Sequence, residues 1–223
     1  VCVITQRGRY RYHAAVTLAV LTLVFTVWAN AARFERGTLH VTALDVGQGE
    51  SVAFISHGHG ALVDCGSSNS YIGAGGVAGD YFSSAGIRSL DAVVLTHYHA
   101  DHANGLAELF SRMRVDALYL PDIAEEEGEK TAVLALAERY GVPVRYVTEE
   151  TTAVLGGAKL TVYPPVGEGD ANELGLTVLC TAGEFDTLIT GDMDSKTERL
   201  LLDTYSMSDI EVLLVGHHGS RYS

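Results

Sequence analysis

Three histidines and an aspartate lie within six residues of one another, directly after a short apolar segment. Leu90–Thr96 has the apolar composition of a buried β-strand, and His97, His99, Asp101 and His102 follow it at once. Alternate residues of an extended segment project to the same side, so His97 and His99 face one point while Asp101 and His102 face a second. Imidazole and carboxylate are ligands of zinc, manganese and iron, and four of them can serve two adjacent ions. The chain must therefore fold so that other segments bring further ligands to this strand end.

Two later predicted strands also end in polar residues that bind metals. Thr187–Thr190 leads into a Gly-Asp pair, and we expect Asp192 to bridge two cations. Val212–Val215 leads into Gly-His-His-Gly-Ser. His217 is the first histidine past that strand and is the better candidate ligand, with His218 as its substitute or as a proton donor.

The remainder of the chain alternates short apolar strands with helices and glycine-containing turns, which is typical of an α/β domain. Residues 66–86 are rich in glycine and serine and are predicted to form a flexible lid. The acidic run 125–129 is interpreted as a solvated loop. Helices are predicted at 103–113, at 129–140 and from a capping box at Ser195 and Glu198 to about 205. Strands are predicted at 39–46, 51–55, 61–63, 90–96, 115–120, 144–147, 159–163, 176–180, 187–190 and 210–215.

The first forty residues differ from the rest. Ala14–Ala32 is an uncharged run of nineteen residues that follows three arginines and has Trp28 near its C-terminal end. As a helix it extends about 28 Å, close to the thickness of a bilayer core. We therefore predict a transmembrane segment at about 14–32, with its N-terminal side in the cytoplasm and the following domain outside. A signal peptide cleaved near Ala29-Asn30-Ala31 is an alternative, and a buried soluble helix is a third, although the run is apolar all round.

Charge separates the two parts and limits the function. Residues 1–37 contain five arginines and one glutamate, a net charge of +4, so residues 38–223 carry −17 of the chain's total of −13. This balance excludes a basic groove that binds phosphates by charge alone, and a nucleic-acid role would need bound metal. Three scattered cysteines form no C-x-x-C pair, so Cys65 and Cys180 are expected to pack as small apolar residues. The sequence begins with Val rather than Met, and its last three residues come directly after a histidine-rich turn. We therefore expect a piece of a longer protein whose domain is incomplete at its C-terminus.

The motifs at the strand ends resemble those of the metallo-β-lactamase superfamily. Members of the superfamily share the motif H-x-H-x-D-H, a later Gly-Asp pair and a further histidine, and they fold as a four-layer αββα sandwich. More narrowly, Leu-Asp-Val-Gly-Gln-Gly-Glu-Ser at residues 44–51, Asp-Cys-Gly at 64–66 and the final His-His-Gly-Ser resemble the C-terminal hydrolase domain of the ComEC family of DNA-uptake channel proteins. The resemblance covers residues 38–223. It implies an α/β sandwich, here truncated at its C-terminus and preceded by one transmembrane helix.

Carried over by position, the resemblance implies a binuclear metal centre with two divalent ions. One ion would be held by His97 and His99. The second ion would be held by Asp101, His102 and His217, and Asp192 would bridge the two ions. Asp64 would orient one of these ligands from behind.

One position departs from the broader superfamily and bears on the metal. That superfamily places a third histidine between the cluster and the bridging aspartate, whereas no histidine lies between His102 and His217 here. Asn172 sits where that ligand would fall, which favours Mn²⁺ over Zn²⁺. Asp101 is expected to be a ligand that also orients the attacking water and to matter most for rate. His218 or Ser220 is expected to assist the leaving group, Ser220 by contacting the substrate.

Three functions are compatible with these features. The favoured one is an exported, membrane-tethered nuclease, a metal-dependent phosphodiesterase that acts on DNA during uptake. Its expected partners are DNA, the membrane and other parts of a DNA-uptake channel, with the hydrolase domain on the extracytoplasmic side of the cell membrane. The second is a secreted or anchored hydrolase of a small ester, lactone or phosphodiester. The third is a non-catalytic module that keeps the fold as part of a DNA channel.

Overall fold

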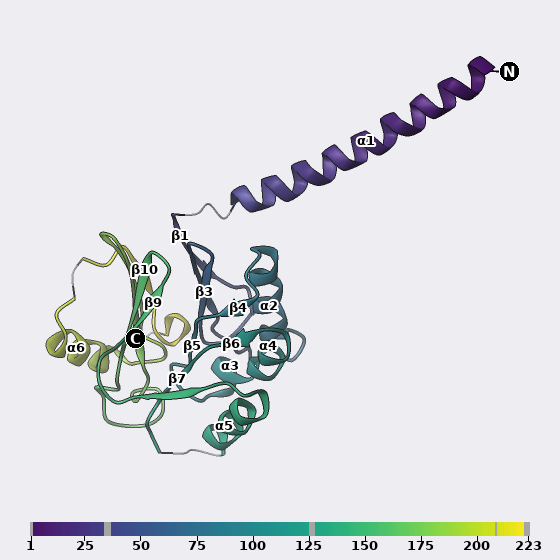
Figure 1. Cartoon of the computed structure of the whole chain (residues 1–223). Coiled ribbons are helices and arrows are strands. Elements are labelled where there is room, and N and C mark those ends of the chain that lie inside the picture. Colours follow the sequence, from purple (N-terminus) through teal and green to yellow (C-terminus); the bar gives the residue numbers. More distant parts are fainter. Residues whose placement is uncertain (1, 34–36, 125–127, 208, 221–223) are drawn as a thin grey trace. The chain divides into compact units, whose positions relative to one another are not determined.

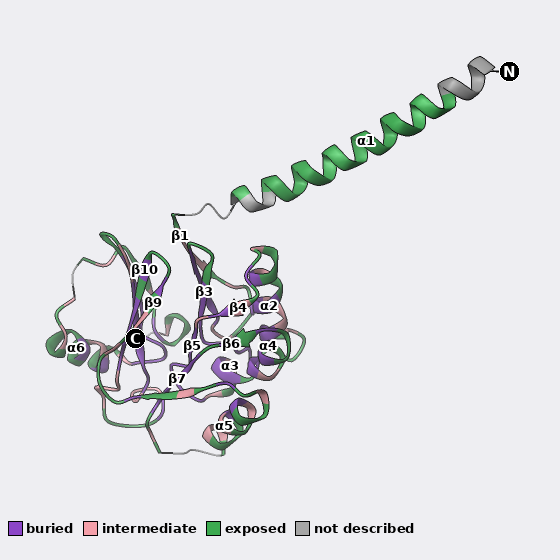
Figure 2. Ribbon diagram, in the orientation of Figure 1, coloured by how far each residue is buried: buried purple, intermediate pink, exposed green. Residues whose placement is uncertain are grey.

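The computed structural model of the chain describes residues 2–33, 37–124, 128–207 and 209–220. The chain divides into two compact units, Val1–Glu35 and Arg36–Ser223. Most of the first unit is one long helix, α1 (Cys2–Arg33). Its stretch Gly8–Ala29 spans 22 residues with a mean hydropathy of 1.7, and is long and apolar enough to cross a membrane. Its described side chains are exposed (Figure 2), so α1 is a candidate membrane span rather than a core helix.

Two β-sheets form the centre of the second unit. The six-stranded sheet has the order β1-β2-β3-β5-β7-β8, and the five-stranded sheet has the order β13-β12-β11-β10-β9. In the first sheet β1, β2 and β3 are antiparallel, and β3, β5, β7 and β8 run parallel. In the second sheet only β12 and β13 run parallel. The strands of the first sheet are β1 (Leu39–Ala43), β2 (Val52–Ser56), β3 (His59–Val63), β5 (Ala92–Val94), β7 (Leu118–Pro121) and β8 (Val144–Val147). Those of the second are β9 (Thr151–Leu155), β10 (Ala158–Tyr163), β11 (Thr177–Ala182), β12 (Phe185–Ile189) and β13 (Val212–Leu214).

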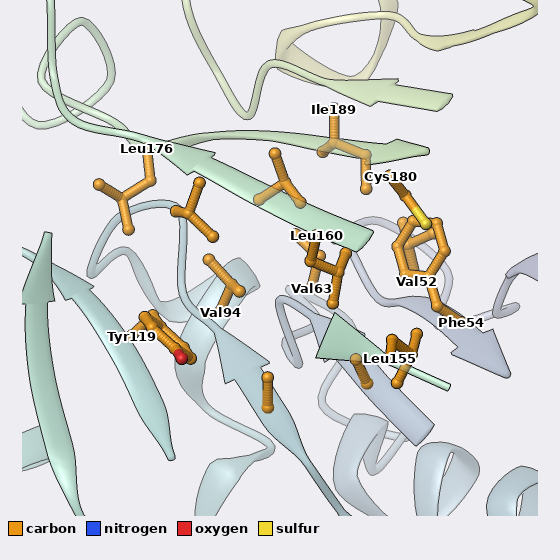
Figure 3. Close-up of a cluster of buried hydrophobic side chains, with 14 of the residues drawn as sticks. Val52, Phe54, Val63, Val94, Tyr119, Leu155, Leu160, Leu176, Cys180 and Ile189 are labelled. Carbon is orange, nitrogen blue, oxygen red and sulfur yellow. The ribbon is translucent and has the colours of Figure 1, made fainter. Parts of the chain in front are cut away.

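The hydrophobic core lies between these two sheets. Phe54 and Val94 of the first sheet and Leu160 and Val178 of the second are among its fully buried members (Figure 3). Branched and aromatic side chains on alternate strand positions fill this space, as expected for two sheets packed face to face. Cys180 lies in the same cluster and Cys65 is also buried, both as free thiols, as predicted.

Helices cover the outer faces of both sheets. Figure 1 shows α2 (Ala74–Ser84), α3 (Ala100–Ala103), α4 (Leu106–Arg112) and α5 (Glu129–Tyr140) on the outer side of the six-stranded sheet. The helix α6 (Ser195–Thr204) packs on the other sheet, where Leu201 joins Tyr163, Leu179 and Leu188. A short parallel pair, β4 (Ser89–Leu90) and β6 (Arg114–Val115), completes the fold. The four-layer αββα sandwich predicted from the sequence is confirmed.

The predicted glycine-rich lid is wrong for residues 74–84, which form α2, whereas residues 66–73 form a loop. The glycines of α2 permit close packing rather than flexibility. A Cβ added at Gly75 would collide with the backbone oxygen of Gly105, and one at Gly79 would lie 3.0 Å from Nε of Arg112. Because glycine lacks a side chain, α2 can lie directly against α4.

Other differences concern element boundaries. The helix predicted at 103–113 is two helices, α3 and α4, separated at Gly105, whose added Cβ would lie 2.7 Å from the Cys65 carbonyl oxygen. The cap of α6 is Asp194, whose Oδ1 accepts the Thr197 N–H at 2.8 Å, so the predicted cap at Ser195 is one residue late. β9 was not predicted. Residues 125–127 of the predicted acidic loop lie outside the described residues, and Glu129 begins α5.

Candidate metal centre

Four strands of the two sheets end at one place. β3 is followed by Asp64 and β5 by the turn that carries the histidine cluster, and these two strands run parallel. β12 is followed by Asp192, and β13, parallel to it, by His217 and His218. The two sheets approach each other here, because an added Cβ at Gly191 would lie 3.0 Å from the Thr96 Cβ. Within the five-stranded sheet, the His217 N–H bonds to the Gly191 oxygen at 3.0 Å, which joins the segments after β13 and β12. The carboxyl ends of strands from both sheets therefore meet at one site.

Asp64 organises the base of this site. Its side chain is fully buried, and its backbone adopts a left-handed φ of 57°. Oδ1 accepts the Thr96 N–H at 2.7 Å, while Oδ2 accepts the Thr96 hydroxyl at 2.7 Å and lies 2.8 Å from Nδ1 of His102. With Nδ1–H donated to Asp64, Nε2 is the ring nitrogen of His102 that remains to bind a metal ion.

The remaining ring nitrogens and carboxylates surround Asp192. Nε2 of His102 lies 3.2 Å from Oδ1 of Asp192, and Nε2 of His97 lies 4.0 Å from Oδ2. Nε2 of His218 lies 3.4 Å from Oδ2 of Asp101 and 3.8 Å from Oδ2 of Asp192. Three groups of possible ligand atoms, each within 4.8 Å, share His102 among the described residues. Two of them lie on the side of Asp192 and Asp101: His97, His102 and Asp192, and Asp101, His102 and His218.

The chemistry of these atoms fits divalent ions. Nε2 of His97, Nε2 of His102 and Oδ1 of Asp192 are buried without a hydrogen-bond partner among the described residues. Nε2 of His102 and Oδ1 of Asp192 lie 3.2 Å apart, within ion-pair distance, but they form no hydrogen bond. Buried polar atoms left without partners are costly in free energy unless a bound group satisfies them. Imidazole nitrogens and a carboxylate that converge in this way are suited to a divalent metal ion.

The histidines of the cluster differ in charge. Burial, followed by the neighbouring His102, lowers the pKa of His97 well below its usual value. Burial also opposes the charged form of His102, but Asp64 and Asp192 outweigh it and raise its pKa to about 11. Burial would raise the pKa of Asp192, yet contacts with His102, then His97 and His218, lower it to about 2. Without a metal ion, these surroundings therefore favour a neutral His97, a protonated His102 and an ionised Asp192.

The structure brings most of the predicted ligands together. His97, Asp101, His102 and Asp192 belong to the two groups of ligand atoms, and the ring centroid of His99 lies 4.7 Å from that of His97. His218, rather than the preferred His217, is the histidine beside Asp101 and Asp192. His217 and His218 have left-handed φ values of 50° and 53°, so the backbone turns sharply after β13. The alternation of side chains between the two faces of a strand therefore does not continue into this turn.

Asn172 and Ser220 occupy peripheral positions. Asn172 Oδ1 is buried without a hydrogen-bond partner among the described residues. Its segment packs beside the cluster, since the Leu176 N–H bonds to the Thr96 oxygen at 2.8 Å. The backbone N–H of Ser220 donates to the His217 oxygen at 2.9 Å in the turn that carries His218. The roles predicted for Asn172 and Ser220 remain predictions.

Sequence reasoning assigned no role to Glu50. Its carboxyl lies within 4.8 Å of the ligand atoms of Asp64 and His102. Burial and then the charge of Asp64 raise the pKa of Glu50 to about 8. Its position directly after Gly-Gln-Gly was the available signal, because such a loop lets the backbone approach other segments closely.

Comparisons with known proteins agree with this arrangement. The pattern of the family described as "Metallo-beta-lactamase superfamily" matches residues 44–223. ComE operon protein 3 of Bacillus subtilis (strain 168) is 27% identical over 200 residues, which cover 82% of this chain and 26% of that protein. Recombination protein 2 of Haemophilus influenzae is 28% identical over 212 residues, which cover 93% of this chain and 24% of that protein. Competence protein ComA of Neisseria gonorrhoeae is 27% identical, over 92% of this chain and 27% of that protein. The chain thus spans about a quarter of the length of these relatives.

Solved structures support the fold alone. The metallo-β-lactamase SMB-1 aligns with a TM-score of 0.55 at 15% identity, over 79% of this chain and 76% of that one. The MIM-2 metallo-β-lactamase aligns with a TM-score of 0.53 at 18% identity, over 80% of this chain and 72% of that one. The family match covers most of the chain, and it agrees with the four-layer sandwich and with the candidate ligands at the strand ends. The chain belongs to the metallo-β-lactamase superfamily, and its domain resembles those of the competence proteins.

Proposed function

We propose that residues 38–223 form a metal-dependent phosphodiesterase that cleaves DNA, and that α1 tethers it to the cell membrane on the extracytoplasmic side. The observation that carries the proposal is the pair of ligand groups that share His102, with buried ring nitrogens that lack hydrogen-bond partners among the described residues. The names of the competence relatives support DNA as the substrate. The net charge of −17 supports a site that relies on bound cations to receive a phosphate.

The residues have distinct roles in this proposal. His97, His99 and Asp192 would hold one ion, and Asp101, His102 and His218 would hold the other. Divalent cations in such centres neutralise charge on the attacked group and lower the pKa of water. Mn²⁺ is favoured because Asn172, an oxygen donor, takes the place of a third histidine.

Two further contacts orient the ligands. Nε2 of His218 lies 3.4 Å from Oδ2 of Asp101, so this nitrogen would bind the second ion beside that carboxylate. Oδ2 of Asp64 fixes His102 through Nδ1 at 2.8 Å, so that the Nε2 of His102 faces the cluster. Asp101, which is half-buried beside His218, orients the attacking water, and Ser220 contacts the substrate.

The experiment is hydrolysis of labelled single-stranded and double-stranded DNA by the full chain in detergent. It is run with Mn²⁺, with Zn²⁺ and with chelator, using the natural sequence and Asp101→Ala. Asp203→Ala is the matched control, because Asp203 is an exposed aspartate on α6. We expect cleavage that requires metal, falls at least about a hundredfold in Asp101→Ala and is unchanged in Asp203→Ala.

Two results would contradict the proposal in different ways. Two bound ions per chain without DNA cleavage would point to a small ester, lactone or phosphodiester as the substrate. No bound ion in the natural sequence would leave a non-catalytic module of a DNA channel.

A further inference from the structure

The loop between β1 and β2 has no role in the function proposed above, although it carries the Gly-Gln-Gly-Glu motif. Its ends are closed by a hydrogen bond from the Leu44 N–H to the Ser51 oxygen at 2.9 Å. An added Cβ at Gly49 would collide with the Gly66 oxygen and would lie 2.8 Å from the Asp101 oxygen. The absence of a side chain at Gly49 thus lets this loop rest directly on the segment that carries the ligands.

Glu50 is tied by its backbone to both segments that form the base of the site. Its N–H donates to the Asp101 oxygen at 3.1 Å, and its oxygen accepts the Gly66 N–H at 3.1 Å. Those two segments are themselves joined, because the Cys65 N–H bonds to the His102 oxygen at 2.7 Å. The position of Glu50 is therefore fixed relative to Asp64, Asp101 and His102.

The side chain of Glu50 is a further carboxyl group near the His102 ring, besides those of Asp64 and Asp192. Its carboxyl oxygen, a carboxylate oxygen of Asp64 and a ring nitrogen of His102 lie within 4.8 Å of one another. These three residues do not form a separate cation site, because the Asp64 oxygens already accept from Thr96 twice and pair with Nδ1 of His102. The carboxyl of Glu50 is thus placed to support the Asp64–His102 pair.

We propose that Glu50 is a positioning residue of the metal centre, which supports the Asp64–His102 pair and so fixes the His102 ring for the ion. This inference rests on the metal centre of the proposed function, but not on DNA as the substrate. Groups that orient metal ligands commonly change metal affinity by 10- to 100-fold when they are altered.

The test compares Glu50→Gln and Glu50→Asp with the natural chain. Glu50 is half-buried and lines a cavity of about 180 Å³ together with His218, Leu214 and Val215, so glutamine fits without repacking the core. Binding of Mn²⁺ and Zn²⁺ is titrated by calorimetry, and thermal unfolding is followed in chelator. Glu138→Gln on the exposed side of α5 is the matched control.

We expect Glu50→Gln to bind one of the two ions about tenfold or more weakly, while its unfolding midpoint in chelator does not fall. Glu50→Asp keeps the carboxyl and should recover part of the affinity, and Glu138→Gln should match the natural chain. Natural affinity for both ions in Glu50→Gln would overturn the inference. So would a loss of affinity in proportion to a lowered unfolding midpoint, because that indicates a purely structural role.

The outcome can be told apart from the fate of the proposed function. Weakened ion binding in Glu50→Gln without DNA cleavage by the natural chain would support Glu50 and contradict the nuclease proposal. An absence of ion binding in the natural chain would overturn both.

Discussion

His102 is the residue on which the candidate centre depends most, because it belongs to all three groups of possible ligand atoms among the described residues. Its ring lies between Asp64, 2.8 Å from Nδ1, and Asp192, 3.2 Å from Nε2. Two carboxylates hold it as a cation until a metal ion replaces the proton on Nε2. The same side chain therefore connects protonation to metal binding.

We predict that metal binding releases a proton from His102. Burial opposes its charge, but Asp64 and Asp192 raise its pKa to about 11, so below that pH an ion must displace a proton. Affinity should then rise by at least roughly tenfold per pH unit between about pH 7 and 8.5. Calorimetric titration in buffers of different ionisation enthalpy measures the release directly. His59→Ala, at an exposed histidine paired with Asp91, is expected to leave the slope unchanged. A pH-independent affinity would contradict the prediction.

Asp64 should contribute to stability as well as to metal binding. Asp64→Asn keeps the size of the side chain but removes the charge that pairs with His102 in a fully buried site. Breaking such a pair removes one of the two carboxylates that balance the buried His102 charge, so we expect a loss of about 3 kcal/mol in the free energy of unfolding. Urea unfolding in chelator is the measurement. Asp91→Asn breaks the exposed pair with His59 and should cost only about 0.5 kcal/mol. Equal losses in the two variants would show that burial of the Asp64 pair is not what matters.

Among the elements, α2 shows how packing can override a local pattern. Its glycines suggested flexibility, yet Gly75 and Gly79 face the backbone and side chains of the α4 segment at short distances. Glycine has a low intrinsic helix propensity, so tertiary contact is needed to explain why the segment is helical.

We predict that Gly75→Ala destabilises the fold by about 2 kcal/mol, because the new methyl group must displace the Gly105 backbone. Gly76→Ala, one residue along the same helix, meets only the flexible end of the Glu108 side chain. Alanine favours the helix over glycine, so this second variant should be neutral or up to about 1 kcal/mol more stable. Thermal and urea unfolding of Gly75→Ala and Gly76→Ala measure the change in the free energy of unfolding. A stabilised Gly75→Ala would mean that α2 and α4 can separate at little cost.

Local signals explain which elements were predicted well. Residues 129–140 and 144–147 match α5 and β8 to the residue, because Gly141 ends the helix with a left-handed φ of 67° and an apolar strand follows. The histidine cluster and Asp192 were found because strand ends are readable from the sequence. The choice between His217 and His218 was not readable, since it depends on two left-handed residues in succession. Glu50 was missed because it reaches the site through contacts with Gly66 and Asp101, which are distant in the sequence.

At the scale of the whole molecule, charge and apolar surface are separated along the chain. The first 37 residues carry +4 and a helix with the composition of a membrane span, while the remainder carries −17. Arginines at 7, 9 and 11 precede the apolar run, and loops rich in Lys and Arg tend to stay on the cytoplasmic side. This asymmetry is the physical basis for placing the acidic domain outside.

The sidedness can be measured with one introduced thiol. Cys65 and Cys180 are buried, so in a Cys2→Ser background the chain should react little with a membrane-impermeant maleimide. Glu184→Cys adds an exposed thiol in the turn between β11 and β12. We expect intact cells to be labelled before permeabilisation, because three arginines before the apolar run favour a cytoplasmic N-terminal side. The labelled chain should remain with the membrane fraction at full size, whereas cleavage after Ala31 would release a shorter soluble domain. Labelling only after permeabilisation would place the domain in the cytoplasm, where it would not meet incoming DNA outside the membrane.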